Sequence, residues 1–481
     1  MINKLQNKLV WLVLVCFTTF LPKAEIFAQE KNDSIKQEAI TLRDMVSGVE
    51  ERVATAENNL EKLTKIKLSG YIQAQWQFFE NPAVFPNNYI SLRCVRLKVQ
   101  YQPLAGVVFV LQPDFSPSGF TLKDAYVDLH DPWLKTFSLW AGQFNRPNYE
   151  VEYSSSKREV PERSKVIRAI YPGERAIGAK LEVTPPSVPL KFQFAVFNGN
   201  DHMVIKDVNS NDINPKNKDF DNYKDLMGRL TYNFTLGNFG GLDLGVNGYC
   251  GWMKSNSTTV LNSDYTFYKN VSIGQSVPRH WVGGEMQLYM DILGGMSIKA
   301  EYMMGINTYP GAGGSFPVAD PVQTTLTNDT LTMTYLFTNT QEIIPTIRRN
   351  FMGGYVYLIK NVGERNQFAF RWDFFDPNTK LTGNQIGVVQ YNNSSSDVKT
   401  STTMVGTNPV IVLNEVTNHV VDNSLKSGSS DITYHTLTFA WNYYFTENLR
   451  IQVAYEMPFN EKVGVEVFPQ NVFTLRLQAK F

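Results

Sequence analysis

The sequence predicts an all-β protein, namely a 16-stranded antiparallel transmembrane β-barrel preceded by a short N-terminal coiled-coil helix. Three observations predict it. Apolar and polar residues alternate from residue 66 to the end, the links between the alternating stretches are sorted by length, and no later stretch reaches the length of a transmembrane helix. The 481 residues carry 45 basic and 45 acidic side chains. The chain lacks the basic excess of nucleic-acid-binding proteins, so no nucleic-acid partner is expected.

The first 28 residues are typical of an export signal. Lys4 and Lys8 precede an apolar run at 9–20, and small residues around Ala28 suit a cleavage site. The run is shorter than the roughly 20 residues that span a bilayer. We therefore expect residues 1–28 to be a signal peptide and the mature chain to be exported.

Residues 29–65 are expected to form a periplasmic helical segment. Within 33–64 apolar residues follow a heptad, with Ala39, Val46, Val53 and Leu60 at one seam position and Leu42, Val49, Ala56 and Leu63 at the other. Such a seam is typical of a coiled coil, here about 50 Å long. The alternative is a single amphipathic helix that packs on its own domain, which Gly48 inside the seam favours.

Residues 66–481 are expected to form the barrel domain. Strands with one apolar face also build soluble sandwiches, in which that face points inward. In a membrane barrel the apolar face points to lipid, the polar face lines a wet lumen, and aromatic side chains gather near strand ends. Charges near the middle of the polar faces, such as Arg229 and Lys299, favour the barrel.

The lengths of the links support the same conclusion. The expected strands are 66–79, 89–102, 106–115, 120–129, 136–144, 176–184, 189–198, 225–235, 241–253, 281–290, 295–305, 349–358, 365–374, 433–445, 447–458 and 470–481. Links after even-numbered strands are tight, and most links after odd-numbered strands are long, apart from 116–119. Bacterial barrels have short periplasmic turns and long external loops, whereas a sandwich has no reason to sort its links this way.

A barrel of sixteen strands encloses an aqueous channel unless something fills it. The link at 145–175 is dense in charge of both signs, with seven basic and five acidic side chains. We expect it to fold into the barrel and to form a constriction. The constriction residues would be Arg146, Lys157, Arg158, Glu159, Glu162, Arg163, Lys165, Arg168, Glu174 and Arg175.

Part of the chain resembles a known family. The stretches 122–127, 141–147, 154–155, 158–159, 161–164 and 171–175, with Gly178, resemble the phosphate-selective porin O and P family in its Bacteroidetes-type branch. The resemblance implies a 16-stranded outer-membrane porin of a Gram-negative bacterium that forms homotrimers. It also implies that the terminal strand, ending at Phe481, is read by the barrel-assembly machinery.

Phosphate selectivity is not implied in the same way, because the expected lumen charges are mixed. They are Arg96, Lys98, Asp124, Asp128, Lys180, Arg229, Glu285, Lys299, Glu301, Arg371, Asp373, Arg450 and Arg476. Arginines of the 145–175 segment can bind anions bidentately, or can pair with its glutamates and fix its shape, which we expect of most of them. A sugar slide would need lumen aromatics, for which Tyr71, Tyr126, Trp281 and Tyr289 are the inward candidates.

Catalysis has little support in the sequence. The five histidines are scattered, and no Cys/His spacing fits a metal site. We expect no enzyme activity, cofactor or metal. The expected function is passive diffusion of small hydrophilic solutes, anions such as phosphate among them, through the outer membrane. The alternatives are a structural anchor with a periplasmic coiled coil and an outer-membrane hydrolase.

Overall fold

A computed structural model describes residues 65–481, apart from 82–85, 118, 148–149, 153, 171–173, 200–222, 256, 293, 311–313, 328–329, 344–345, 387–388, 392–394, 406–407, 420–424, 427–430 and 462–470. Residues Ile66–Phe481 form one compact unit. The expected signal peptide and almost all of the expected coiled coil lie outside the described residues, so both stay predictions.

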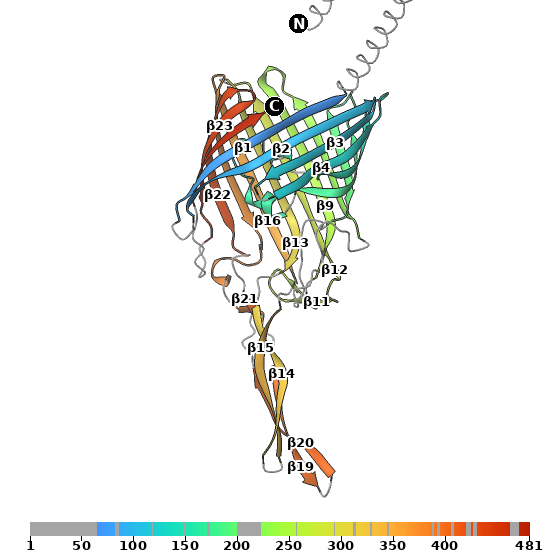
Figure 1. The fold of residues 1–481 in the computed structure, drawn as a ribbon, viewed down its shortest axis with the longest axis vertical. Coiled ribbons are helices and arrows are strands. Elements are labelled where there is room, and N and C mark those ends of the chain that lie inside the picture. The colour runs from blue at the N-terminus through green and yellow to red at the C-terminus, as the bar shows by residue number, and fades with distance from the viewer. Residues whose placement is uncertain are drawn as a thin grey trace, which may run out of the picture. The chain divides into compact units, whose positions relative to one another are not determined.

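Sixteen strands form the wall of a closed antiparallel barrel (Figure 1). They are β1 (Ile66–Phe79), β2 (Asn88–Leu104), β3 (Val107–Ser116), β4 (Gly119–His130), β5 (Phe137–Asn145), β6 (Arg175–Val183), β7 (Leu190–Phe197), β8 (Asp225–Thr235), β9 (Gly240–Lys254), β12 (Ser276–Met290), β13 (Met296–Pro310), β16 (Thr346–Val362), β17 (Asn366–Asp376), β22 (Tyr434–Thr446), β23 (Leu449–Pro458) and β24 (Val472–Lys480). Each corresponds to a strand predicted from the sequence, and their bounds agree within five residues. The predicted fold class is confirmed.

The first and last strands close the barrel. β1 pairs with β24 from Tyr71 opposite Lys480 to Phe79 opposite Val472. Beyond this ladder, the main-chain groups of Gly70 and Phe481 exchange hydrogen bonds of 3.0 and 3.1 Å. A Cβ on Gly70 would lie 2.5 Å from the ring of Phe481, so this position accommodates only glycine beside the terminal aromatic ring. We call this end of the barrel the terminal end and the opposite one the loop end.

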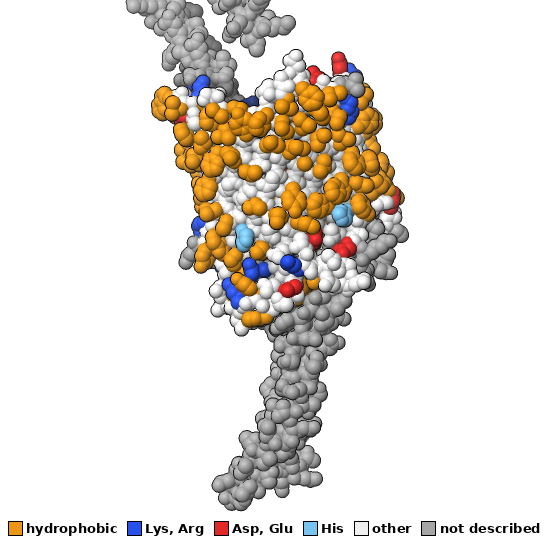
Figure 2. Space-filling model, turned by 180° about the vertical axis from the view of Figure 1, so that it is seen from behind, with side chains coloured by type: hydrophobic (Ala, Val, Ile, Leu, Met, Phe, Trp, Pro, Cys, Tyr) orange, Lys and Arg blue, Asp and Glu red, His pale blue; other side chains and the backbone are white. Residues whose placement is uncertain are grey.

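Strand alternation places apolar side chains outside. Figure 2 shows them as a band over the visible face, with charged side chains near its two edges. Members of this outer surface include Leu68, Trp76, Leu230, Val246 and Phe368, all of them well exposed. So large an exposed apolar surface would be unfavourable in water, whereas the acyl chains of a lipid bilayer would cover it. In the described part of the chain, none of the helices has the length and apolar character to cross a membrane.

The links at the loop end contain further elements. They are the helices η1 (Glu150–Glu152) and α3 (Lys165–Ile170), the strands β10 (Thr259–Asn262), β11 (Phe267–Asn270), β14 (Gly314–Thr327), β15 (Thr330–Ile343), β18 (Val389–Tyr391), β19 (Ser395–Val405), β20 (Asn408–His419) and β21 (Leu425–Lys426), and η3 (Gly383–Gln385). β10 adds to β16 in parallel, and β14–β15 and β19–β20 are antiparallel hairpins. The links at the terminal end are short, as between β22 and β23, and one of them contains η2 (Gly237–Phe239).

Candidate functional site

The link between β5 and β6 lies inside the barrel. Side chains from the wall donate hydrogen bonds to its main-chain carbonyls, and we call its described residues between 150 and 174 the inward segment. Gln73 of β1 donates to Ser155 at 2.9 Å, Gln452 of β23 and Asn442 of β22 donate to Glu159 at 2.9 Å, and Arg476 of β24 donates to Pro161 at 2.8 Å. These four strands are neighbours in the wall. Farther round the barrel, Lys299 of β13 binds Glu159 and Arg279 of β12 donates to the carbonyl of Ile170, both at 2.7 Å, so the segment crosses the interior.

The carboxylate of Glu152 fixes the start of the segment. It is fully buried and accepts hydrogen bonds from the main-chain N–H of Ser164 at 2.9 Å, from the Ser164 hydroxyl at 2.8 Å and from the Tyr357 hydroxyl. The guanidinium of Arg371 on β17, also fully buried, donates to it at 3.3 Å and pairs with Asp373 at 2.9 Å. A buried carboxylate needs such partners, because its desolvation is otherwise costly.

Apolar packing holds the short helix α3 against the wall. Val166, Ile167 and Ile170 are almost completely buried and belong to a cluster with Phe351 and Phe375 of the wall. Burying an aliphatic side chain contributes about 1.5–3 kcal/mol. The interior between α3 and β16–β17 is therefore a packed core.

Arg158 stabilises the segment from within. Its side chain is buried and donates to the carbonyl of Pro161 at 2.7 Å and to that of Val160 at 3.3 Å. Burial, with the nearby Arg163, lowers the pKa of Arg158 to about 10. This arginine therefore holds the shape of the segment.

Two glutamates of the segment each bind two arginines. Glu162 accepts from Arg93 at 3.0 Å and from Arg476 at 2.9 Å, and Glu174 pairs with Arg163 and Arg175. Burial alone would raise the pKa of both carboxyls, but the arginines outweigh it and hold the pKa of each well below its ordinary value. Glu174 has a positive φ of 63°, which is unfavourable for a residue with a Cβ, and its two ion pairs help to hold it there.

Charged side chains gather in the part of the lumen between the segment and the β1–β4 wall, which we call the narrow region. Arg96 pairs with Asp114 at 2.7 Å and donates to the Tyr71 hydroxyl at 2.7 Å, and Arg175 pairs with Asp124 at 2.9 Å. All five side chains are less than one-tenth exposed. Together with the pairs of Glu162 and Glu174, they form a group of charged side chains that we call the charged ring.

Two β-bulges add cations to this region. In the pairing of β1 with β2, Arg93 has no partner between Leu92 and Cys94, and in the pairing of β3 with β4, Lys123 has none between Leu122 and Asp124. An extra residue in a strand redirects a side chain. Arg93 reaches Glu162 and Lys123 interacts electrostatically with Glu174, so both bulges direct a cation into the lumen.

A group of lysines lies towards the terminal end. Lys98 of β2 interacts electrostatically with Lys67 of β1 and Lys157 of the segment, and Lys157 also interacts with Lys480 of β24. Ser69 lies opposite Lys98, and Tyr71 lies opposite Lys480, which places these strands side by side. Within the described residues, none of these four lysines forms an ion pair. We call them the lysine cluster.

A cavity of about 570 Å³ opens on the loop-end side of the narrow region. Its walls come from β1–β4 and from Glu162, Arg168 and Glu174 of the segment. The lumen between the segment and β1–β4 thus has a wide polar chamber, the charged ring and the lysine cluster.

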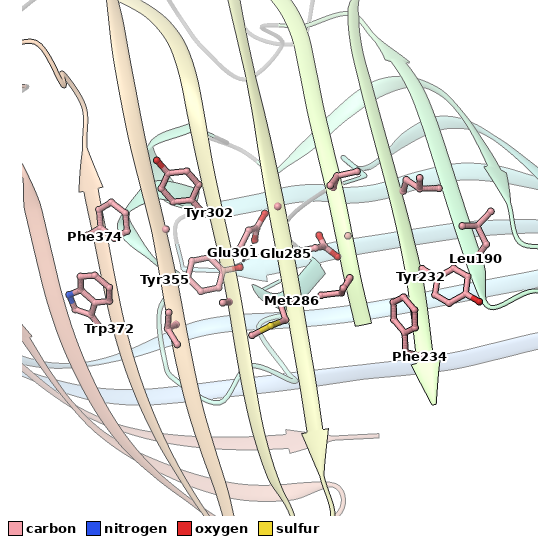
Figure 3. A pocket seen from close by; sticks show the side chains of 18 residues that line it. Leu190, Tyr232, Phe234, Glu285, Met286, Glu301, Tyr302, Tyr355, Trp372 and Phe374 are labelled. Carbon is pink, nitrogen blue, oxygen red and sulfur yellow. Dashed lines mark hydrogen bonds between the residues drawn. The ribbon is translucent and has the colours of Figure 1, made fainter. Parts of the chain in front are cut away.

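A larger cavity of about 880 Å³ lies on the outer surface of the wall (Figure 3). Its lining includes Leu230, Tyr302 and Val356, all at outward positions and about 40% exposed. Glu285 and Glu301 touch it only from the far side of the wall, since both are buried and Glu285 binds Arg229. This groove faces lipid and not the lumen.

The other sequence-predicted residues are distributed around the interior. Lys299 pairs with Glu159 at 2.7 Å, Arg450 donates to the carbonyl of Arg158 at 3.0 Å, and the main-chain N–H of Lys165 donates to Asp373 at 3.1 Å. Contacts away from the narrow region are made by Arg146 with Gly199, Asp128 with Ser138, Lys180 with Glu182, Arg229 with Glu285 and Glu301 with Tyr355. Of the five arginines of the 145–175 segment, Arg163 and Arg175 pair with its glutamate Glu174, whereas Arg146 and Arg158 donate to carbonyls; the roles predicted for the site residues stay predictions.

Several residues that contact the segment were not among the predicted ones. The amides Gln73, Asn442 and Gln452 hold the segment, and strand parity placed them in the lumen without indicating a partner. Arg93 and Lys123 could not be found by parity, because the bulges interrupt it. In the part of the chain that the structure describes, no group of His, Cys, Asp and Glu is arranged to hold a metal ion.

Comparisons with known proteins identify the fold. No family model and no curated protein matches the sequence. Among solved structures, the high-pH structure of Pseudomonas putida OprB matches with a TM-score of 0.50 and 8% identity over 88% of this chain and 96% of that one. An anion-selective porin from Comamonas acidovorans matches with a TM-score of 0.48 and 10% identity over 86% of this chain and 99% of that one.

The fold also indicates which membrane the barrel spans. Closed antiparallel barrels with an even number of strands and an apolar outer band are outer-membrane proteins of Gram-negative bacteria. The barrel described above has all three features. The predicted outer-membrane location is thereby confirmed.

Proposed function

We propose that the protein is an outer-membrane porin through which small hydrophilic solutes diffuse passively, with a preference for anions such as phosphate. In bacterial barrels both chain ends lie on the periplasmic side. The terminal end would then face the periplasm and the loop end the outside. A solute would enter the cavity between the segment and β1–β4, pass the charged ring and leave past the lysine cluster.

The proposal rests on the excess of basic over acidic side chains along this path. Around the ring, seven basic residues, Arg93, Arg96, Lys123, Arg163, Arg168, Arg175 and Arg476, stand against four acidic ones, Asp114, Asp124, Glu162 and Glu174. The lysine cluster adds four further cations without ion pairs to described residues. Basic groups along a pore favour anions, and the glutamates neutralise only part of this charge.

Planar-bilayer recording of the purified full chain tests the proposal. Under a KCl gradient we expect a steady open conductance and a reversal potential on the anion-selective side. Lys98→Gln combined with Lys157→Gln should move the reversal potential towards cations. Lys360→Gln, a change on the outer surface, serves as the control and should leave it unchanged. A closed barrel, or a cation-selective one, would contradict the proposal.

We also propose that the porin assembles as a homotrimer and that its terminal strand is recognised by the barrel-assembly machinery, both in keeping with the family resemblance. Cross-linking of the protein in native outer membranes should give a trimer, and Phe481→Ala should slow insertion. The alternative of a structural anchor rests on residues 33–64. These lie outside the described residues, so it stays a prediction.

A further inference from the structure

The loop-end cavity has an aromatic mouth. Phe79 and Tyr89 both line it, and their rings stack with centroids 5.8 Å apart at an interplanar angle of 16°. Tyr89 is 38% exposed, and its hydroxyl donates to Gln77 at 3.0 Å. Aromatic rings at a polar mouth offer an apolar surface on which a flat, partly apolar ring packs. Small inorganic anions have no apolar surface that could pack on these rings.

Hydrogen-bonding groups follow directly below the aromatic pair. Gln77 is joined to Gln75, whose side-chain amide donates to it at 2.7 Å. The hydroxyl residues Ser91 and Thr121 line the same cavity from β2 and β4. Amides and hydroxyls both donate and accept hydrogen bonds, which suits a ligand with several hydroxyl groups.

The charged lining includes Arg93 and Arg96, which pair with Glu162 and Asp114, and two further cations. Lys123, placed by its bulge, and Arg168, which is exposed on α3, both face the cavity. Within the described residues, neither forms an ion pair. A carboxylate in the cavity would bind them as charge-assisted hydrogen-bond donors.

A stacked aromatic pair beside a cation also occurs beyond the charged ring, where the cation, Lys180, pairs with Glu182. Tyr126 and Trp140 stack at 4.4 Å with an interplanar angle of 10°, and the Lys180 ammonium lies 3.3 Å from the centre of the Trp140 ring. Tyr126 is two residues after Asp124 on β4, towards the terminal end. A ring-shaped anion that leaves the first platform would therefore meet a second one before the exit.

We propose that the cavity is a binding site for anionic sugars, meaning monosaccharides that carry a carboxylate. The sugar ring packs on Phe79 and Tyr89, its hydroxyls bond to the amides and hydroxyls below, and its carboxylate binds Lys123 and Arg168. The volume of about 570 Å³ lies within the usual range for small-ligand sites. The inference rests on the proposed porin function and narrows its solute class.

Block of the ion current tests this. Galacturonate, added on the loop-end side of the full-length protein in a planar bilayer, should reduce the conductance of KCl in a saturable way. Galactose, which lacks the charge, and acetate and inorganic phosphate, which lack the ring, should need at least tenfold higher concentrations. Equal block by galactose would indicate a neutral-sugar site, and equal block by acetate or phosphate would indicate attraction by charge alone. Either result overturns the proposal.

Substitutions locate the site. Tyr89→Leu and Phe79→Leu should each raise the half-blocking concentration of galacturonate about tenfold, since an aromatic platform is lost. Trp76→Leu alters an outward aromatic residue on the same strand and should have no effect. An open, anion-selective channel that galacturonate does not block refutes the sugar site alone, whereas an absence of open current refutes the porin function itself.

Discussion

Replacing Glu152 by glutamine would release the inward segment from its main anchor. The change preserves the shape of the side chain but removes the charge that accepts hydrogen bonds from Ser164, Tyr357 and Arg371. A hydrogen bond to a charged group contributes about 1.5–3 kcal/mol, and Arg371 would keep its pair with Asp373. We expect a loss of about 3 kcal/mol, which raises the detached population of the segment about 100-fold.

Single-channel recording measures this population. A detached segment no longer narrows the lumen, so Glu152→Gln should show larger and more frequent conductance fluctuations than the wild type. The matched control is Glu285→Gln, which breaks a buried pair with Arg229 that does not touch the segment. If Glu152→Gln gave a wild-type trace, or if both variants fluctuated alike, the segment would not be anchored as described.

Two further predictions concern the same segment. A Cβ on Gly353 would lie 2.7 Å from the Cγ2 atom of Val166, so Gly353→Ala should overpack α3 at a cost of about 1–3 kcal/mol and lower the unfolding temperature in detergent. The control is Gly284→Ala, whose Cβ would lie 3.9 Å from its nearest neighbour and which should leave that temperature unchanged. Equal shifts in the two variants would contradict the packing of α3. Because the pKa values of Glu162 and Glu174 are held below the ordinary value of about 4.3, their ion pairs should stabilise the segment above that pH and persist below it, failing only as pH falls through the lowered values. Channel fluctuations recorded from pH 7 downwards should therefore stay constant to about pH 4, and a transition above that pH would argue against the arginine pairs.

The barrel could be predicted because the same local alternation of apolar and polar residues is required in every strand. Lipid outside and water inside impose alternation on each strand, and the sorted links add the order of the strands. The inward fold of the 145–175 link could also be expected, since a segment so rich in charge does not pack against lipid. The bounds of β12 and β13 were less accurate, because both strands extend beyond the membrane, where alternation no longer has a cause.

The ion pairs and hydrogen bonds within the site could not be predicted from the alternation of apolar and polar residues. Which arginine pairs with which glutamate depends on the path of the segment across the lumen, as with Arg476 and Glu162, which are more than 300 residues apart in the chain. The amides that hold the segment, such as Gln73, look like any solvated lumen residue in the sequence. The aromatic mouth was missed because Phe79 and Tyr89 occur at strand ends, where aromatic residues usually face lipid.

Because of the bulges at Arg93 and Lys123, the charge of the lumen can change while the strands of the wall stay the same. In a strictly regular strand, adding a positive charge to the lumen means exchanging one inward residue for another. Here each extra residue supplies a cation while its neighbours keep their orientation towards lipid or lumen. Removing one of them by deletion would restore the regular ladder and subtract a charge in a single step. The number of strands and the diameter of the barrel would stay the same, so selectivity can change in such a wall without a change of fold.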